Sequence, residues 1–481
     1  MGRIDLVFSS AIFIFVFLPV VFILYRLIPS LKIKNLLLAA ASIVFYAFGQ
    51  LQYVPLFLAS VLINYFSGLL LQRETPRRRA ILALAVVLNI GILCVFKYTD
   101  FVIRNLNGAL SLSLPYSGIV LPIGISFFTF QGLSYTIDVY RDRKSGTKDF
   151  LKLLLYISFF PQLIAGPIVK YHDIADQIDE RETTPEQSGY GVRRFITGLA
   201  KKLLIANAVG YIADYVFNIC LPEGITDWPL MWLGGICYTL QIYFDFSGYS
   251  DMAIGMGRMF GFRFRENFNY PYASASLKEF WRRWHISLSS WFKEYLYIPL
   301  GGNRRGRLRT VFNKLHVFFS TGIWHGANRT FVFWGLCHGL LSSLEDLGVI
   351  PAEKLGKSRL GRLFARVWTL LAVMLLFVVF RAESISQAFF MIGRMFCGGT
   401  SRYGLYLFRM LLSPAACAVI VLGLLFAGRL PLLIHEGIEK SGLEQKTAFR
   451  AASVLFFLAL YFLCILSLAR GGFNPFIYFQ F

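Results

Sequence analysis

The sequence predicts an all-α protein that crosses a membrane many times. Of its 481 residues, 56% are hydrophobic and 17% are aromatic, and the mean hydropathy is +0.58. Soluble domains are only about 45–50% apolar. The charged residues gather between apolar runs, many of which approach the roughly 20 residues that a spanning helix requires. We therefore expect one membrane domain over residues 1–481 rather than several soluble domains.

The apolar runs locate the expected helices. The candidate spans, of which the eighth is too long for one simple crossing, are 6–28, 35–49, 51–71, 80–96, 118–139, 195–219, 229–250, 311–344, 363–380, 406–428 and 449–469. The segment 149–169 is also apolar, but it contains Pro161, Gly166 and Pro167. Irregular backbone at membrane depth must line a cavity or be buried in protein. We therefore expect a broken, re-entrant piece there, with a kinked ordinary span as the alternative.

The charge distribution predicts the topology. A formal net charge of +21 would suggest nucleic-acid binding in a soluble protein, but here cytoplasmic loops rich in Lys and Arg explain it. We expect contact with membrane lipid and none with nucleic acid. Alternate basic loops place the N-terminus outside, and 258–314, with 12 Lys/Arg against 3 acidic residues, inside. Because 353–366 is basic too, 311–344 should enter and return, turning near 322–328.

An aromatic stretch precedes this passage. Between Ser276 and Leu300, aromatic residues recur at helical spacing with basic residues between them. The pattern predicts one amphipathic helix suited to the headgroup layer. Taken alone, it is typical of an interfacial anchor, although it also contains His285.

Two histidines follow Ser320 in the long apolar passage itself. His325 and His338 are ionisable groups, which membranes tolerate poorly, so both are functional candidates; the alternative is a core histidine bonded to a neighbouring helix. Being 13 residues apart, they would not share a face of one straight helix. A break near Gly326 could bring them to a common cavity. No Cys or acidic residue has ligand spacing to them, which argues against a metal site and leaves proton transfer as general base.

Two further polar features are candidates. A glycine-flanked basic loop next to the aromatic stretch could grip the phosphates of a nucleotide-bearing donor, or could simply be a cytoplasmic loop. Its residues of interest are Asn303, Arg304, Arg305 and Arg307. Asp245 lies in an apolar span, either as a buried polar anchor or as part of the same cavity.

Several motifs together resemble one family. They are Phe280-Trp-Arg-Arg-Trp-His285, Tyr295-Leu-Tyr-Ile-Pro-Leu-Gly-Gly-Asn-Arg304, Gly322-Ile-Trp-His-Gly-Ala327 and Trp334-Gly-Leu-Cys-His-Gly339. With other matches from residue 7 to the C-terminus, they resemble the membrane-bound O-acyltransferase family, most closely its bacterial alginate O-acetylation branch. The branch that transfers D-alanine to teichoic acids is similar in plan.

The resemblance implies a fold and a reaction. The fold would be a ring of tilted helices and re-entrant segments around a central funnel, with a motif-rich core at about 118–345 and C-terminal helices at 360–481. His325 would be catalytic and His285 a second polar site, while His338 matches a histidine of this branch. The acyl group, expected to be acetyl, would come from a cytoplasmic acyl-CoA such as acetyl-CoA, with no cofactor.

The resemblance also implies a setting. The protein would lie in the cytoplasmic membrane and serve O-acetylation of an extracellular or cell-envelope polysaccharide. An esterase-like extracytoplasmic acetyltransferase would be its partner. D-alanyl transfer to teichoic acid is the alternative within the family. A proton-coupled transporter or flippase is the alternative outside it, although the paired repeats typical of transporters are absent from the sequence.

The aromatic segment at residues 473–481 provides one further hypothesis. Its simplest interpretation is an interfacial anchor. Tyr478 offers one hydroxyl in this otherwise apolar segment, and could accept the acyl group transiently before passing it to an outer partner.

Overall fold

The computed structural model describes residues 7–164 and 166–471. Within these ranges every regular element is a helix, which confirms the all-α prediction. The chain forms two compact units, Met1–Phe195 with Tyr249–Glu266, and Ile196–Gly248 with Asn267–Phe481. Each unit is thus built from two separate stretches of chain. The prediction of a single membrane domain stays a prediction.

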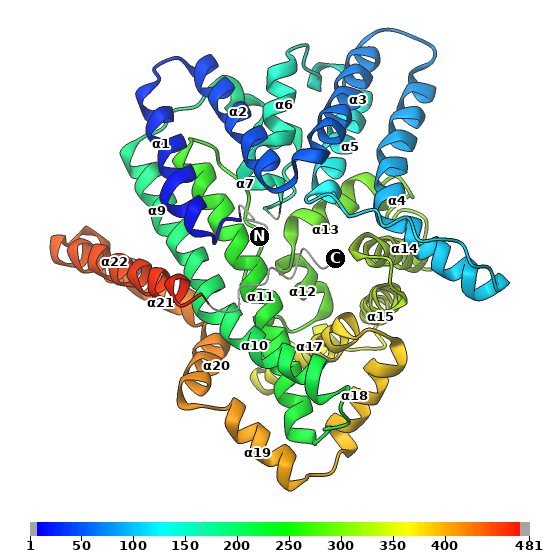
Figure 1. The fold of residues 1–481 in the computed structure, drawn as a ribbon, viewed down its shortest axis with the longest axis vertical. Coiled ribbons are helices and arrows are strands. Elements are labelled where there is room, and N and C mark those ends of the chain that lie inside the picture. Colours follow the sequence, from blue (N-terminus) through cyan, green and yellow to red (C-terminus); the bar gives the residue numbers. More distant parts are fainter. Residues whose placement is uncertain (1–6, 165, 472–481) are drawn as a thin grey trace. The chain divides into compact units, whose positions relative to one another are not determined.

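The first unit is a group of packed helices. In it α3, α4 and α5 pack against one another, and α2 packs against α6 (Figure 1). The bounds are α1 Leu18–Leu27, α2 Leu31–Gln50, α3 Val54–Gln72, α4 Arg78–Leu110, α5 Ile125–Arg141, α6 Phe150–Ser158, α7 Phe160–Leu163 and α8 Tyr171–Asp179. Helix α9, Pro185–Ala200, runs from this unit into the second.

Three expected spans of the first unit differ from the structure. The run 6–28 forms a π-helix at Phe13–Phe17 continued by α1, together short for a crossing. The run 118–139 becomes helical only at Ile125, because Gly124 before it has a φ of +75° that a helix cannot continue. The apolar helix expected at 80–96 extends as α4 from Arg78 to Leu110.

The break expected at 158–168, within the apolar segment 149–169, is confirmed. Helix α6 ends at Ser158, and the four-residue α7 begins at Phe160 with Pro161 in its first turn. The chain from Ser158 to Leu163 is buried in the first unit. Its irregular backbone is therefore covered by protein, as membrane depth requires.

The second unit carries the remaining helices. Their bounds are α10 Asn207–Tyr215, α11 Trp228–Met259, α12 Leu277–Arg283, α13 Ile286–Phe292, α14 Arg307–His325, α15 Arg329–Asp346, α16 Ala352–Leu355, α17 Arg359–Arg381, α18 Ile385–Cys397, α19 Arg402–Leu411, α20 Pro414–Ala427, α21 Leu430–Lys440 and α22 Thr447–Ala469. Helix α11 ends in the first unit. Short π-helices at Lys201–Ala206 and Val216–Cys220 continue α9 and α10.

Several helices are long and apolar enough to cross a membrane. Among the described residues they are Leu31–Gln72, Arg78–Leu110, Pro185–Cys220, Arg359–Arg381 and Thr447–Ala469. The multi-pass prediction is confirmed by these spans. The expected span 406–428 is wrong in shape, because α19 and α20 meet at a 70° bend near Pro414. Pro lacks the N–H that a continuing helix would need there.

The passage 311–344 is a helical hairpin, which confirms that the chain turns back within it, whereas its entry into the membrane stays a prediction. Helices α14 and α15 pack against each other (Figure 1), and the chain turns at residues 326–328. Glycines allow the close approach. A Cβ on Gly322 would lie 2.5 Å from the carbonyl oxygen of Phe331, and one on Gly335 would overlap the carbonyl of Phe318. Small residues at such contacts are typical of helix pairs in membranes.

The single amphipathic helix expected at 276–300 is wrong. The chain forms α12 and α13 with a sharp break at His285, whose φ is +43°. The aromatic residues of this stretch are also less exposed than an interfacial anchor would be. Phe280, Trp284 and Trp291 are each 7% exposed or less, because they pack inside the second unit rather than facing lipid.

Candidate active site

His285 lies at the break between α12 and α13 and is 1% exposed. The carboxamide oxygen of Asn267 holds this break, since it accepts from the N–H of Ser287 at 3.1 Å and from its hydroxyl at 2.8 Å. The same oxygen lies 3.2 Å from Nδ1 of His285. Burial lowers the pKa of His285 to about 3, so the ring is neutral at physiological pH.

His325 is the last residue of α14, at the turn of the hairpin. It is half-buried, and its ring contacts Trp334 at 5.2 Å and Phe380 at 5.0 Å between centroids. Asn328 then starts α15 by accepting from the N–H of Thr330. Gly326 must stay small, because a Cβ there would lie 2.6 Å from the ring of Phe331. The residues of the Gly322–Ala327 motif therefore form a turn that packs tightly around the imidazole of His325.

His338 lies on α15 and is fully buried. Its Nδ1 accepts from the indole N–H of Trp281 at 3.3 Å. Its ring lies 5.0 Å from Trp334, the same residue that contacts His325. The predicted break thus brings His325 and His338 against one indole, although a straight helix would have separated them.

The three histidines belong to one continuous group of rings, which we call the histidine cluster. His285 lies 6.1 Å from Trp324, which lies 4.9 Å from His325. Trp334 then connects His325 to His338 and lies 5.8 Å from Trp281. The cluster comprises His285, Trp324, His325, Trp334, His338 and Trp281. It is a packed aromatic core that contains three imidazoles.

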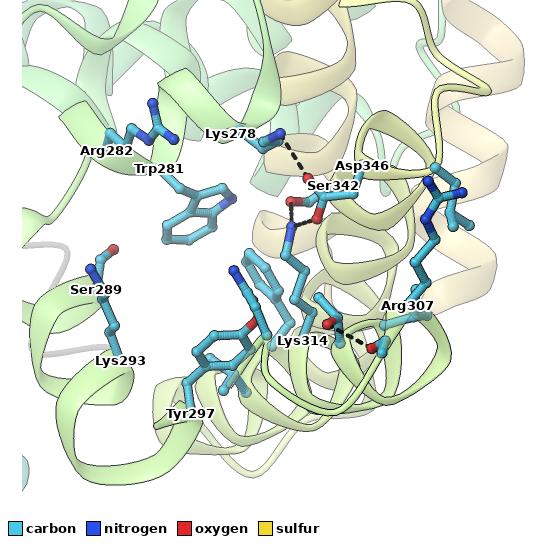
Figure 2. A pocket seen from close by; sticks show the side chains of 17 residues that line it. Lys278, Trp281, Arg282, Ser289, Lys293, Tyr297, Arg307, Lys314, Ser342 and Asp346 are labelled. Atoms are coloured by element: carbon cyan, nitrogen blue, oxygen red, sulfur yellow. Dashed lines mark hydrogen bonds and ion pairs between the residues drawn. The ribbon is translucent and has the colours of Figure 1, made fainter. Parts of the chain in front are cut away.

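A cavity of about 680 Å³ adjoins this cluster at Trp281. Figure 2 shows Trp281 beside the cavity, with charged side chains around it. Its basic side chains are Lys278, Arg282, Lys293, Arg307 and Lys314, against the single carboxylate of Asp346. With a formal charge of +4, this basic cavity suits an anionic ligand.

Asp346 ties the cavity wall together. Its carboxylate lies 2.7 Å from Nζ of Lys278 and also pairs with Lys314 (Figure 2). Burial alone would raise the pKa of Asp346, but these two ammonium groups outweigh it and lower the pKa below its usual value. The neighbouring Glu345 accepts from the backbone N–H groups of Leu277 and Lys278 at 2.7 and 3.0 Å. The end of α15 therefore fixes the start of α12, which carries Trp281.

The donor-binding candidates divide into two groups. Asn303 and Arg307 line the basic cavity, whereas Arg304 and Arg305 are exposed outside its lining. Asp245 is 2% exposed and lies 2.6 Å from the equally buried Lys202. It is therefore a buried ion pair, as the polar-anchor interpretation predicts. Tyr478 lies outside the described residues.

Sequence reasoning missed three residues of this site. Asn267 is fully buried beside His285, Trp281 bonds to His338, and Asp346 bridges two lysines of the cavity. Asn267 lies in a stretch of mixed aromatic and polar residues, so no pattern distinguishes it from the other polar residues there. Trp281 lies inside the aromatic stretch, but its contact with His338 joins residues 57 apart. Asp346 follows Glu345 at the end of an apolar run, which was the one available signal.

Comparisons with known proteins identify the family of the chain. The model of the membrane-bound O-acyltransferase family matches residues 71–348, which include all three histidines of the cluster. The chain is 38% identical to a probable alginate O-acetylase of Azotobacter vinelandii, over 99% of this chain and 100% of that protein. It is 37% identical to a peptidoglycan O-acetyltransferase of Helicobacter pylori, over 80% of this chain and 78% of that protein.

A more distant relative is named for D-alanyl transfer to teichoic acid. The chain is 29% identical to a teichoic acid D-alanyltransferase of Bacillus subtilis, over 47% of this chain and 59% of that protein. The family match covers more than half of the chain, and the alginate relative matches nearly all of it. The protein is therefore a multi-pass O-acyltransferase of the membrane-bound O-acyltransferase family.

Proposed function

We propose that the protein binds acetyl-CoA in the basic cavity and transfers its acetyl group to a hydroxyl group of an acceptor. The transfer would take place beside His325. The acetyl group would serve O-acetylation of a polysaccharide of the cell envelope or cell surface. The relatives named for alginate and peptidoglycan O-acetylation, which resemble the chain over most of its length, support this substrate class. The composition of the cavity supports a donor that carries phosphate groups.

The main support for the proposal is that the basic cavity and His325 lie at opposite ends of the same helical hairpin. The basic cavity lies at the open end of the α14–α15 hairpin, where Arg307, Lys314 and Asp346 line it. His325 lies at the closed end, and the rings of the histidine cluster lead from Trp281 to it. An acyl donor whose phosphates sit among the basic residues would extend its thioester toward these rings.

The two ends of the hairpin lie next to segments that are predicted on opposite sides of the membrane. The loop that precedes α14 is strongly basic and is expected in the cytoplasm. At the turn, the carboxamide of Asn328 donates to the carbonyl of Glu383 at 3.1 Å. If the basic segment 353–366 is inside, one crossing by α17 places the loop 381–405, which contains Glu383, outside. A donor entering from the cytoplasm and an acceptor approaching from outside would then meet near His325. This arrangement supports a location in the cytoplasmic membrane, where it would separate donor from acceptor.

The reaction needs one base and one acyl transfer. The acceptor hydroxyl oxygen attacks the thioester carbonyl carbon as His325 takes the hydroxyl proton. The C–S bond then breaks, and the proton passes to the departing thiolate. The products are the O-acetyl ester and free CoA. The acceptor would be an esterase-like extracytoplasmic acetyltransferase or Tyr478, either of which would pass the acetyl group to the polysaccharide.

The direct test is transfer of radiolabelled acetyl from acetyl-CoA to purified protein in vesicles, with the wild type beside His325→Ala. We expect label on protein or added acceptor with the wild type alone. The control is His316→Ala, which changes an exposed histidine on the same helix and should transfer normally. Equal transfer by wild type and His325→Ala would overturn the role of His325. Labelling from a D-alanyl thioester but not from acetyl-CoA would overturn the proposal that acetyl-CoA is the donor.

If transfer occurs, Tyr478→Phe tests the relay. Normal polysaccharide acetylation by this variant would exclude the phenol as an intermediate carrier and leave the extracytoplasmic partner as the acceptor.

A further inference from the structure

The two fully buried histidines have different partners at Nδ1. His285 faces the carboxamide oxygen of Asn267, whereas His338 faces the indole N–H of Trp281. In both rings Nε2 is buried and has no hydrogen-bond partner among the residues that the structure describes. The partner at Nδ1 therefore decides whether Nε2 carries a proton, since a neutral imidazole has one N–H.

The chemistry at His285 is fixed by a backbone group. The N–H of Ser287 can only donate, so the atom of Asn267 that it contacts must be the oxygen. This oxygen lies 3.2 Å from Nδ1 of His285. The hydroxyl of Ser287 also lies 3.4 Å from Nδ1, but it donates its proton to the same Asn267 oxygen at 2.8 Å, so at Nδ1 it can only accept. A bare Nδ1 would set two lone pairs against each other, whereas a protonated Nδ1 donates a hydrogen bond. The proton of His285 therefore lies on Nδ1, and Nε2 has a free lone pair.

The chemistry at His338 is fixed by an indole. The N–H of Trp281 is a donor with no acceptor capacity, and it lies 3.3 Å from Nδ1 of His338. A proton on that nitrogen would set two N–H groups against each other. Nδ1 therefore accepts, and the proton of neutral His338 lies on Nε2.

We infer that Asn267 and Trp281 are positioning residues that hold the two buried histidines in opposite tautomers. Nε2 of His285 is a hydrogen-bond acceptor and Nε2 of His338 a hydrogen-bond donor. Within the proposed acyl transfer, His285 would accept from a hydroxyl or thiol, and His338, beside the donor cavity, would donate to an oxygen. These roles rest on the proposed function, whereas the tautomers do not.

The tautomers can be measured without activity. Histidine labelled with 15N would be incorporated into the full-length protein in lipid nanodiscs, and the ring signals assigned with His285→Gln and His338→Gln. Protonated and bare ring nitrogens give separate signals. We expect protonated Nδ1 in His285 and protonated Nε2 in His338. The same tautomer in both rings, or the reverse in either, would overturn the inference.

The positioning residues have conservative tests. Trp281→Phe keeps a ring but removes the donor, so the signals of His338 should become a mixture of tautomers. The transfer rate at saturating donor should fall roughly fivefold to tenfold, the scale of one buried hydrogen bond. Because Trp281 also lines the basic cavity, the ring signals of His338, rather than KM for acetyl-CoA, decide this test. Trp291→Phe, which changes a neighbouring buried indole on α13, is the matched control and should leave the signals of His338 in place.

Asn267 allows a rescue experiment. Asn267→Asp retains an acceptor oxygen at the same position and should keep the tautomer of His285, whereas Asn267→Ala should lose it. If Asn267→Ala left the signals of His285 unchanged in a folded protein, Asn267 would not be the positioning residue. Unchanged tautomers with no acetyl transfer in the wild type would instead count against the proposed function alone.

Discussion

The histidine cluster and the basic cavity lie in the same unit and share Trp281, but they are built in opposite ways. In the cluster, aromatic rings pack closely around buried imidazoles, and Trp334 and His338 are 2% exposed or less. The cavity instead presents partly exposed cations, such as Lys278 and Lys314, whose side chains are 28% and 19% exposed. A group that reacts must be held in one geometry. A group that binds phosphate mainly needs charge, so its exact position matters less.

The first way to break this comparison is to remove the packing of the cluster. Trp334→Ala should destabilise the protein by about 3–5 kcal/mol, the usual cost of deleting a buried aromatic ring. Transfer should be lost because His325 and His338 both lose their support. Thermal unfolding in detergent and acetyl transfer measure the two effects. The control is Trp334→Phe, which keeps a ring and should recover most of the stability. If Trp334→Ala were as stable as the wild type, the cluster would not be tightly packed.

The second way is to separate the two helices that carry cluster and cavity. Gly335→Ala should destabilise the hairpin by about 1–3 kcal/mol through overpacking, because the added Cβ would overlap the carbonyl of Phe318. The control is Gly393→Ala, which lies in α18 with open space around the added Cβ. That change should be neutral or stabilising by up to about 1 kcal/mol. Equal unfolding temperatures of the two variants would contradict the close packing of α14 on α15.

The third way is to weaken the cavity while leaving the cluster intact. The double variant Lys293→Gln/Arg307→Gln should raise KM for acetyl-CoA roughly tenfold, since two exposed charge contacts contribute on the order of 1–2 kcal/mol together. The rate at saturating donor should not change, and the effect should shrink at high salt. The matched control is Arg304→Gln/Arg305→Gln, which removes the same charge outside the cavity lining. If the control raises KM as much, only the general charge of the loop matters.

The smallest effect concerns the pH dependence of the cavity wall. The pKa of Asp346 is lowered in the folded protein, so its ion pairs stabilise above the unfolded pKa of about 3.9. That contribution is lost as pH falls through the folded pKa. Since the side chain is 25% exposed, it should amount to less than about 1 kcal/mol. Unfolding of the wild type and Asp346→Asn should therefore differ at pH 6 and converge below pH 4; a constant difference would exclude the charge as its cause.

The sequence was most informative where a physical constraint acts on neighbouring residues. The return of the chain between α14 and α15 followed from basic residues on both sides of one apolar passage. A break near Gly326 was suggested by the spacing of His325 and His338, which could face a common cavity only across such a break. The motifs around His285 and His325 pointed to the family that the comparisons then confirmed.

The sequence was least informative where distant residues meet. The break at His285 was hidden because the aromatic residues around it have helical spacing, and a positive φ is unexpected at a residue other than glycine. The bond between Trp281 and His338 joins two helices, so only their packing reveals it. The division of the basic loop into Arg307 at the cavity and Arg304 outside it depends on the direction of each side chain, which composition does not contain.

One crossed measurement tests directly whether the cluster reacts and the cavity binds. Acetyl-CoA binding and the rate of acetyl transfer would be measured for the wild type, His325→Ala and Lys293→Gln/Arg307→Gln. We expect His325→Ala to bind with unchanged Kd while transfer falls by a factor of about 10² to 10⁴, the range for a general base. The double variant should bind roughly tenfold more weakly and transfer normally at saturation. Loss of binding in His325→Ala, or loss of saturated rate in the double variant, would contradict this division of roles.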